Sequence, residues 1–373
     1  MGRIFKEHGR RYLDFSYVPP KLPHREQEIQ VLLNLLTPIT RGEVETYSIP
    51  VLYGKTGTGK TTTAKKVLEL LSTMRMSITL NTVLINCGVD QKPFSVAQRL
   101  SRFTLDTYTR GYGPEEIIQM VYDALEIRDE YLIIVLDEVD ELIRYDRGRF
   151  LYILTRIDEA RDIKRIFPIL ITRKYEYILD LPKHIRNKIS GPFIYFKPYT
   201  IKQMRDIVVD RVRLALNEEA ITEGAIYVIS YIASVNEGGD ARTAISLLLN
   251  AGDLAERENS KKIFVEHVRR VYEESSGYLY RFLGKLEPKL TQLLLCLAKV
   301  LSKNIDEFII SNRVMGEIQL CMANQFMRSL TFREIEELLE RLYERGILSK
   351  INGNYALLMM SPISILSAHE YFQ

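Results

Sequence analysis

Cysteine is scarce in this chain of 373 residues, because Cys87, Cys296 and Cys321 are its only three thiols and no two of them form a CxxC pair. Three distant cysteines are not a disulfide framework, so we expect a reducing, intracellular compartment. Long apolar runs are also missing, since no stretch reaches the roughly 18 residues that a membrane span requires. The charged N-terminus does not resemble a secretory signal. We therefore expect a cytoplasmic protein with no membrane partner.

An excess of one charge is absent as well, because 51 Lys and Arg face 48 Asp and Glu. The net charge therefore neither indicates nor excludes nucleic acid, and only local patches can. The five histidines show no metal-ligand spacing. A composition of 46% hydrophobic and 27% charged residues is ordinary for a globular protein. The length is enough for two or three domains with their own cores.

Apolar runs alternate with helical patterns in the first half of the chain. Strands are expected at 49–53, 81–86, 131–137 and 166–172, and helices at 29–36, 61–71, 117–125 and 150–160. Strands that alternate with helices predict an α/β domain with a mostly parallel sheet. From there to about residue 276 the sequence shows only helical periodicity, which predicts a helical second domain. Three expected helices follow (290–301, 314–326, 331–345), and then a hairpin at Asn352-Gly353. Three helices and a hairpin are typical of a winged helix-turn-helix. We expect domains at 1–197, 198–276 and 283–373.

A phosphate-binding loop is the most specific motif. The run Gly54-Lys55-Thr56-Gly57-Thr58-Gly59-Lys60-Thr61 fits GxxxxGK[ST], follows an expected strand and opens an expected helix, which Thr62 continues. Glycines let backbone N–H groups surround the phosphates, and the helix N-terminus adds positive charge. Lys60 should reach the β- and γ-phosphates, and the Thr61 hydroxyl should bind Mg²⁺. The sequence therefore predicts ATP or ADP as ligand.

A second acidic motif completes this site. The apolar strand Leu132–Leu136 ends in Asp137-Glu138, about 80 residues after the loop. Asp137 is expected beside Mg²⁺, and Glu138 is expected to orient or deprotonate the attacking water. The next acids, Asp140 and Glu141, are expected to be solvated or structural.

With these motifs the chain resembles the archaeal origin-recognition and replication-initiation AAA+ ATPases, relatives of the eukaryotic origin-recognition complex and the cell-division-cycle helicase loader. The resemblance extends over nearly the whole chain. It rests on the loop, on LDEVDEL at 136–142, and on four further segments: 18–26 (VPPKLPHRE), Asn86-Cys87, 196–200 (FKPYT) and 239–242 (GDAR). It implies an AAA+ base with a parallel sheet, a helical lid and a C-terminal winged helix. It also implies that Val18, Pro19 and Arg25 lie at the adenine pocket.

The resemblance assigns Arg242 as the lid arginine that senses the γ-phosphate, although a surface arginine at a helix start is the alternative. Two departures concern hydrolysis. Arg173 stands where the family usually has a polar residue, often Asn, with Thr172 as a partial substitute. The family's arginine finger aligns nearer His184, so two alternatives are open: Arg186 serves as the finger, or the chain has none. We therefore expect tightly held ATP and slow turnover at most.

Two segments are candidates for binding DNA. In the winged helix, Arg333 on the third helix and Lys350 on the wing are the expected contacts. The third helix is expected to bury Phe332, Ile335, Leu338, Leu339 and Leu342. Residues 283–373 contain ten basic and ten acidic residues, so a protein-interaction module is the alternative reading of this domain.

The second candidate is the segment 99–113, which resembles the family's initiator-specific insertion. It contains three arginines and one acid, Asp106. Arg102, Arg110 and the backbone at Gly111 are the expected phosphate contacts. The alternative is an ordinary helix-loop-helix with a solvated arginine face.

The resemblance implies an ATP-binding replication initiator that recognises origin DNA as a duplex, acts with initiator paralogues and helps to load the replicative helicase ring. It would be cytoplasmic and nucleoid-associated. Two alternatives remain: a motor or clamp-loader type of AAA+ ATPase, and a winged-helix ATPase that regulates transcription. The weak arginine finger and Arg173 argue against a motor.

Overall fold

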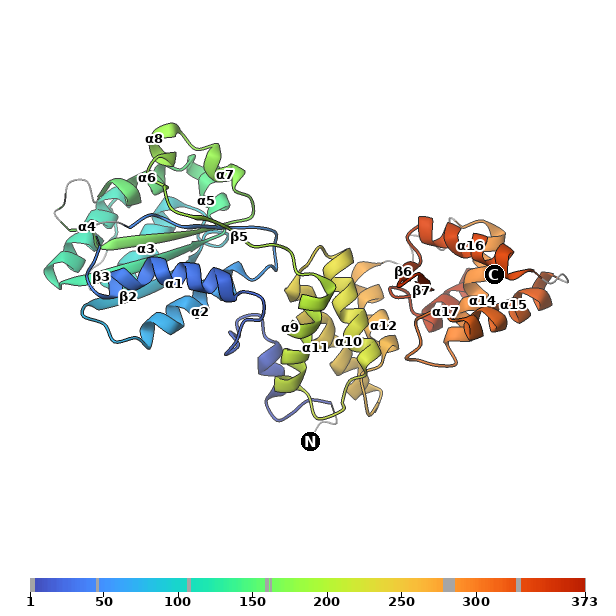
Figure 1. Cartoon of the computed structure of the whole chain (residues 1–373). Coiled ribbons are helices and arrows are strands. Elements are labelled where there is room, and N and C mark those ends of the chain that lie inside the picture. The colour runs from blue at the N-terminus through green and yellow to red at the C-terminus, as the bar shows by residue number, and fades with distance from the viewer. Residues whose placement is uncertain are drawn as a thin grey trace. The chain divides into compact units, whose positions relative to one another are not determined.

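The computed structural model describes residues 4–44, 47–105, 109–157, 161, 163–277, 286–326 and 330–372. The chain forms two compact units (Figure 1): Val18–Pro198, and Met1–Tyr17 together with Tyr199–Gln373.

The first unit is built on a parallel sheet of five strands in the order β2-β3-β4-β1-β5. The strands are β1 (Val51–Tyr53), β2 (Thr79–Asn86), β3 (Glu130–Asp137), β4 (Ile166–Thr172) and β5 (Phe193–Tyr195). The central strands β3 and β4 are apolar nearly throughout, as expected for strands covered on both faces. The sheet confirms the predicted α/β class. The sequence did not predict β5, which has only three residues.

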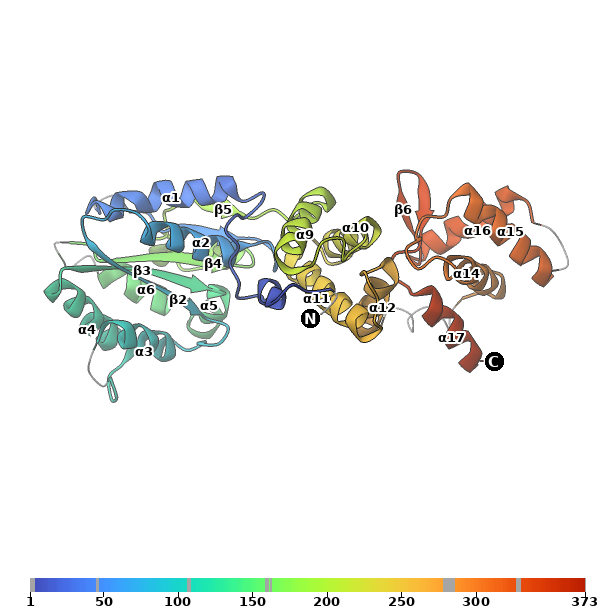
Figure 2. The ribbon, with the colours of Figure 1, turned by 90° about the horizontal axis from the view of Figure 1, so that it is seen from below.

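Helices cover both faces of the sheet, as Figure 2 shows. One face packs on α1 (Glu26–Thr40) and α2 (Lys60–Ser72) through a core that includes Leu32, Leu52 and Val67. The other face packs on α3 (Pro93–Thr104), α4 (Pro114–Ile127), α5 (Val139–Asp146) and α6 (Arg149–Arg156). Two short helices, α7 (Glu176–Leu179) and α8 (Lys183–Arg186), lie between β4 and β5.

The second unit contains a bundle of helices that follows the sheet domain in sequence. Its elements are α9 (Ile201–Ala215), α10 (Glu223–Tyr231), a π-helical turn η3 (Ile232–Asn236), α11 (Ala241–Arg257) and α12 (Val265–Ser276). The capping box of Thr200 and Gln203 starts α9. The helical periodicity of the sequence is thereby confirmed.

The first residues of the chain pack on this bundle, whereas the sequence prediction assigned residues 1–197 to the sheet domain. The Lys6 N–H donates to Ala215 O (2.9 Å), and Arg10 on η1 (Gly9–Leu13) pairs with Asp253 at 2.7 Å. Phe5 enters the bundle core. A basic, turn-rich sequence shows no periodicity that could reveal this docking.

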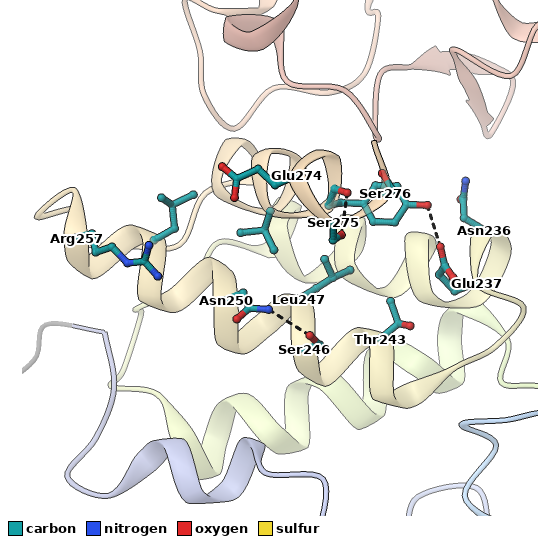
Figure 3. Close-up of a pocket in the computed structure, with 13 residues that line it drawn as sticks. Asn236, Glu237, Thr243, Ser246, Leu247, Asn250, Arg257, Glu274, Ser275 and Ser276 are labelled. Carbon is teal, nitrogen blue, oxygen red and sulfur yellow. Dashed lines mark hydrogen bonds between the residues drawn. The ribbon is translucent and has the colours of Figure 1, made fainter. Parts of the chain in front are cut away.

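A polar hollow of about 940 Å³ lies between α11 and α12 (Figure 3). Hydroxyl and amide groups line it, among them Thr243, Ser246, Asn250 and Ser275. The Tyr272 hydroxyl donates to Glu237 Oε1 at 3.0 Å across one end. The hollow contains none of the predicted nucleotide-binding residues.

The last segment has the helices and hairpin of a winged helix. Its elements are α14 (Pro288–Leu301), α15 (Asn312–Phe326), α16 (Phe332–Glu344), β6 (Ser349–Ile351), β7 (Asn354–Ala356) and α17 (Pro362–Phe372). Asn352 and Gly353 form the predicted turn, both with positive φ. Phe332 was expected in the core but is 51% exposed, because it is the first residue of α16 and the helix buries the Ile335, Leu339 and Leu342 face instead.

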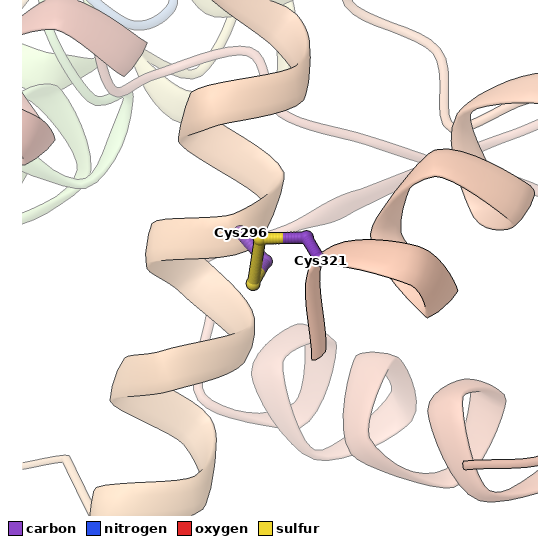
Figure 4. The surroundings of a disulfide bond; sticks show 2 residues. All are labelled: Cys296 and Cys321. Carbon is purple, nitrogen blue, oxygen red and sulfur yellow. A yellow bond between two sulfur atoms is a disulfide. The ribbon is translucent and has the colours of Figure 1, made fainter. Parts of the chain in front are cut away.

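Cys296 on α14 and Cys321 on α15 form a disulfide (Figure 4), with 5.7 Å between their Cα atoms. This pairing corrects the expectation that the three cysteines stay reduced, while Cys87 is a buried thiol. The two residues are 25 apart in sequence, and only the packing of α14 on α15 brings them together.

Buried charged groups join α12 to the winged helix. Arg269 is fully buried and donates to the carbonyls of Glu307 (3.1 Å) and Leu357. The Ser361 hydroxyl donates to Glu266. Burial raises the pKa of Glu273 to about 7, and burial lowers the pKa of Arg269 to about 10. Buried charges need partners, so these contacts fix where the winged helix sits on α12.

In the described part of the chain, no helix is long and apolar enough to cross a membrane.

Candidate functional site

The phosphate-binding loop lies between β1 and α2, as its flanking sequence predicted. Gly54, Gly57 and Gly59 all have positive φ, which residues with a side chain rarely adopt. A Cβ on Gly54 would come within 2.5 Å of Phe196 O, so only glycine fits there. Lys60 is buried and donates to the carbonyls of Gly54 (2.6 Å) and Lys55 (2.7 Å), which hold its ammonium over the loop.

The acidic motif meets this loop at the carboxyl end of β3. The Thr61 hydroxyl donates to Asp137 Oδ2 at 2.7 Å, although the two residues are 76 positions apart. Such a hydroxyl–carboxylate pair fits Mg²⁺, which prefers oxygen ligands and keeps several waters. Glu138 follows with a left-handed backbone (φ 53°), which turns the chain from β3 into α5. No cluster of three or more acidic, histidine or cysteine ligands occurs among the described residues.

Arg25 holds the phosphate-binding loop through hydrogen bonds. Its side chain is buried, and its guanidinium donates to Thr58 O (2.9 Å), Lys197 O (2.7 Å) and Glu28 Oε1 (3.0 Å). Arg25 therefore ties the loop to the start of α1 and to the end of β5. Of the other residues predicted at the adenine pocket, Pro19 is buried and Val18 is half-buried.

Arg173 follows the last residue of β4 and forms a charged cluster with α5. Its Nε donates to Asp140 Oδ2 (2.8 Å), and its Nη2 contacts Glu141. Asp140 is fully buried and also accepts from the Thr172 hydroxyl (3.3 Å). The hydrogen bond to Asp140 raises the pKa of Arg173. Asp140 is thus structural rather than solvated, and sequence reasoning missed its partner.

Arg242, the predicted γ-phosphate sensor, and Arg186, one alternative for the arginine finger, lie on different elements. Arg242 lies in the first turn of α11, where its N–H donates to Asp240 Oδ1 (2.7 Å), and its exposed side chain has no ion pair within the described residues. Arg186 on α8 donates to Leu179 O (2.8 Å), and the His184 ring packs edge-on against Tyr152. Arg242 belongs to the second unit and the loop to the first, so its role stays a prediction.

The segment predicted to touch DNA in the first unit connects α3 to α4. Arg102 and Arg110 are exposed and form no ion pair with any residue that the structure describes. Gly111 is exposed with φ 95°. Phe103 and Tyr112 are also exposed. Residues 106–108, including Asp106, lie outside the described residues.

The cations of the winged helix are engaged by carboxylates at each position expected to meet DNA. Arg333 pairs with Glu337 at 3.5 Å, and Lys350 pairs with Glu340 at 2.6 Å while lying over the ring of Tyr343. Arg341 and Arg345 both pair with Glu287. A phosphate would have to compete with these acids for each of the cations.

Comparison with known proteins adds independent findings. A model described as "Cdc6 AAA+ ATPase-type lid domain" matches residues 205–273, and one described as "AAA domain" matches residues 43–174. The ORC1-type DNA replication protein of Pyrococcus abyssi is 30% identical over 93% of this chain and 83% of its own length. ORC1-type DNA replication protein 1 of Archaeoglobus fulgidus is 33% identical over 93% and 84%. This chain belongs to the ORC1-type DNA replication protein family.

Solved structures agree on the fold. Cdc6p of Pyrobaculum aerophilum matches with a TM-score of 0.85 over 99% of this chain and 100% of that one, at 24% identity. The Aeropyrum pernix ORC1 protein, solved in complex with DNA, matches with a TM-score of 0.67 over 100% and 99%, at 26% identity. The predicted family, the AAA+ fold with its helical lid and the C-terminal winged helix are thereby confirmed.

Family membership makes this ORC1-type chain a nucleotide-binding protein of the P-loop class. The individual roles of the loop residues, of Asp137 and Glu138, and of the DNA-contact candidates stay predictions. The pairing of Asp140 with Arg173 could have been found from sequence. Because β3 and β4 are neighbours whose carboxyl ends meet, an acid that follows β3 and an arginine that follows β4 lie within reach of each other.

Proposed function

We propose that this chain is an ATP-binding replication initiator that recognises origin DNA as a duplex, together with initiator paralogues, and helps to recruit the replicative helicase. Its likeness to ORC1-type replication proteins over 93% of its length carries the proposal. The DNA in the Aeropyrum pernix ORC1 complex supports it. The setting would be cytoplasmic and nucleoid-associated.

In the nucleotide site, Lys60 and the loop N–H groups would bind the phosphates of ATP or ADP, and Thr61 and Asp137 would hold Mg²⁺. The metal would neutralise phosphate charge. Glu138 would orient the attacking water through its carboxylate. Arg173 is held by Asp140 where relatives place a polar side chain, so ATP would act mainly as a slowly hydrolysed ligand.

In duplex DNA binding, Arg102, Arg110 and the Gly111 backbone would supply the leading phosphate contacts, and Arg333 and Lys350 weaker ones. The absence of ion pairs at Arg102 and Arg110, in the part of the chain that the structure describes, favours this ranking. Removing one cation that neutralises a phosphate should lower the salt dependence of binding by about 0.9 in log–log slope.

The test measures binding of the purified protein to duplex fragments that tile its own candidate origins, across a salt series. Arg110→Ala should weaken binding and reduce the slope by the amount expected for about one phosphate. Lys350→Ala should weaken binding and reduce the slope by less, because Glu340 already neutralises the Lys350 ammonium. Arg205→Ala is the matched control, an exposed lid arginine paired with Glu223. Equal binding to every fragment at near-physiological salt would contradict the proposal.

A further inference from the structure

Four aromatic rings gather at one end of the sheet in the first unit. The Tyr53 ring at the end of β1 lies 5.4 Å from Tyr175, 6.5 Å from Phe193 and 5.1 Å from Tyr195, centroid to centroid. Tyr53 and Tyr195 are stacked. Tyr175, Phe193 and Tyr195 are 40%, 40% and 46% exposed. We call these four residues the aromatic face.

The aromatic face is not part of either core of the sheet. Val51, two residues before Tyr53, is fully buried in the core beneath α3–α6, whereas Tyr53 is only half-buried and joins no core. Phe193 and Tyr195 alternate with buried Ile194 on the edge strand β5. Three of the four rings therefore stay partly exposed at the β1–β5 side of the sheet, and exposed aromatic groups of this kind mark interaction sites.

The sequence that leads through β5 is basic. Residues 181–198 contain Lys183, Arg186, Lys188 and Lys197 and no Asp or Glu. Lys174 precedes Tyr175, Lys197 follows Tyr195 by two residues, and both are exposed. Neither lysine forms an ion pair among the described residues, whereas the winged-helix cations do. The acids nearest in sequence, Glu176 and Asp180, lie at the two ends of α7.

We propose that the aromatic face binds single-stranded DNA. Tyr195 and Phe193 would stack on unpaired bases, and Lys174 and Lys197 would contact the flanking phosphates. Stacked rings beside cations are how proteins hold single strands without reading sequence, because every base has a π-face. A duplex offers no such face, since its bases already stack on each other. The choice of DNA over RNA rests on the replication function proposed above.

Tryptophan fluorescence can report this contact specifically, because the chain contains no tryptophan of its own. In a Tyr195→Trp variant the only indole lies on the aromatic face, and a base stacked on it quenches its fluorescence. Tyr145→Trp is the matched control, since Tyr145 on α5 is exposed but lies outside the face. The probe is an unstructured oligothymidylate of about 20 nucleotides, added to the full chain.

The same oligonucleotide, end-labelled, gives the affinity by fluorescence anisotropy. We expect quenching of Tyr195→Trp but not of Tyr145→Trp, with the same midpoint as the anisotropy curve. A Phe193→Ala/Tyr195→Ala variant should bind at least about tenfold more weakly, since alanine substitution of a stacking ring costs about tenfold or more. Its binding to origin duplex should be unchanged, and its circular dichroism should match the wild type.

Three outcomes would overturn the proposal. The wild type could fail to bind the oligonucleotide, the oligonucleotide could bind without quenching the indole, or the fluorescence could change with protein concentration alone, which would make the face a protein-docking surface. Failure of the wild type to bind duplex would instead contradict the proposed function, so the two failures are distinguishable.

Discussion

The carboxyl group of Glu273 should make the stability of the second unit depend on pH. Glu273 on α12 is buried against the winged helix, and burial raises the pKa of its carboxyl from 4.5 to about 7. One pKa unit corresponds to about 1.4 kcal/mol, so the shift amounts to about 3 kcal/mol as an upper value. The folded protein holds this proton more tightly than the unfolded chain. The associated stability is therefore fully present below pH 4.5 and lost as the pH rises through about 7.

Glu273→Gln keeps the size and hydrogen-bonding capacity of the side chain without its charge. At about pH 8 we expect the variant to be more stable than the wild type by about 1–3 kcal/mol, and at about pH 4 nearly equal to it. Urea unfolding followed by circular dichroism measures the difference. Glu274→Gln is the control, because Glu274 is the exposed neighbour on the same helix. If the two variants behave alike at high pH, the buried-proton argument is refuted.

Three further predictions concern the nucleotide site and the disulfide. Lys60→Ala should weaken ATP binding by roughly a hundredfold in a fluorescent-nucleotide titration, because alanine cannot donate a charge-assisted hydrogen bond to phosphate. An Asp140→Asn/Arg173→Asn double variant, which avoids leaving a buried unpaired carboxylate, should release phosphate from ATP faster than the wild type. Equal or slower release would contradict the proposal that Arg173 slows hydrolysis. Cys296→Ser should cost about 3 kcal/mol of stability under oxidising conditions, and reductant should lower the melting temperature of the wild type but not of the variant.

The sheet domain could be predicted well because its signals are local. The strand at 166–172 coincides with β4, since an unbroken apolar run bounded by polar residues leaves little choice. The phosphate-binding loop has its chemistry written in consecutive residues, so its place between β1 and α2 followed from the sequence. The turn at Asn352-Gly353 was predicted for the same reason, because positive φ at both positions requires such residues.

The features that could not be predicted from the sequence depend on contacts between distant segments. Cys296 and Cys321 meet only through the packing of two helices, which no spacing rule reveals. The docking of the first residues on the lid rests on pairs such as Arg10 with Asp253. The neutralisation of Lys350 by Glu340 depends on how the wing folds back on α16. The equal numbers of basic and acidic residues in 283–373 indicated a neutral domain but could not assign which acid pairs with which cation.

The cluster at Arg173 explains why a simple replacement by the family's usual polar residue is unfavourable here. Asp140 has no exposed surface, and a buried carboxylate without a cationic partner costs several kcal/mol. Thr172 supplies one hydrogen bond to Asp140 at 3.3 Å, which is too weak to compensate the charge by itself. Asp140 and Arg173 therefore stabilise each other as a pair. Arg173 directly follows β4, where the resemblance places the polar residue that positions the attacking water. Under the proposed function, the packing of α5 against β4 and the rate of hydrolysis would therefore be coupled, and faster hydrolysis would require Asp140 and Arg173 to change together.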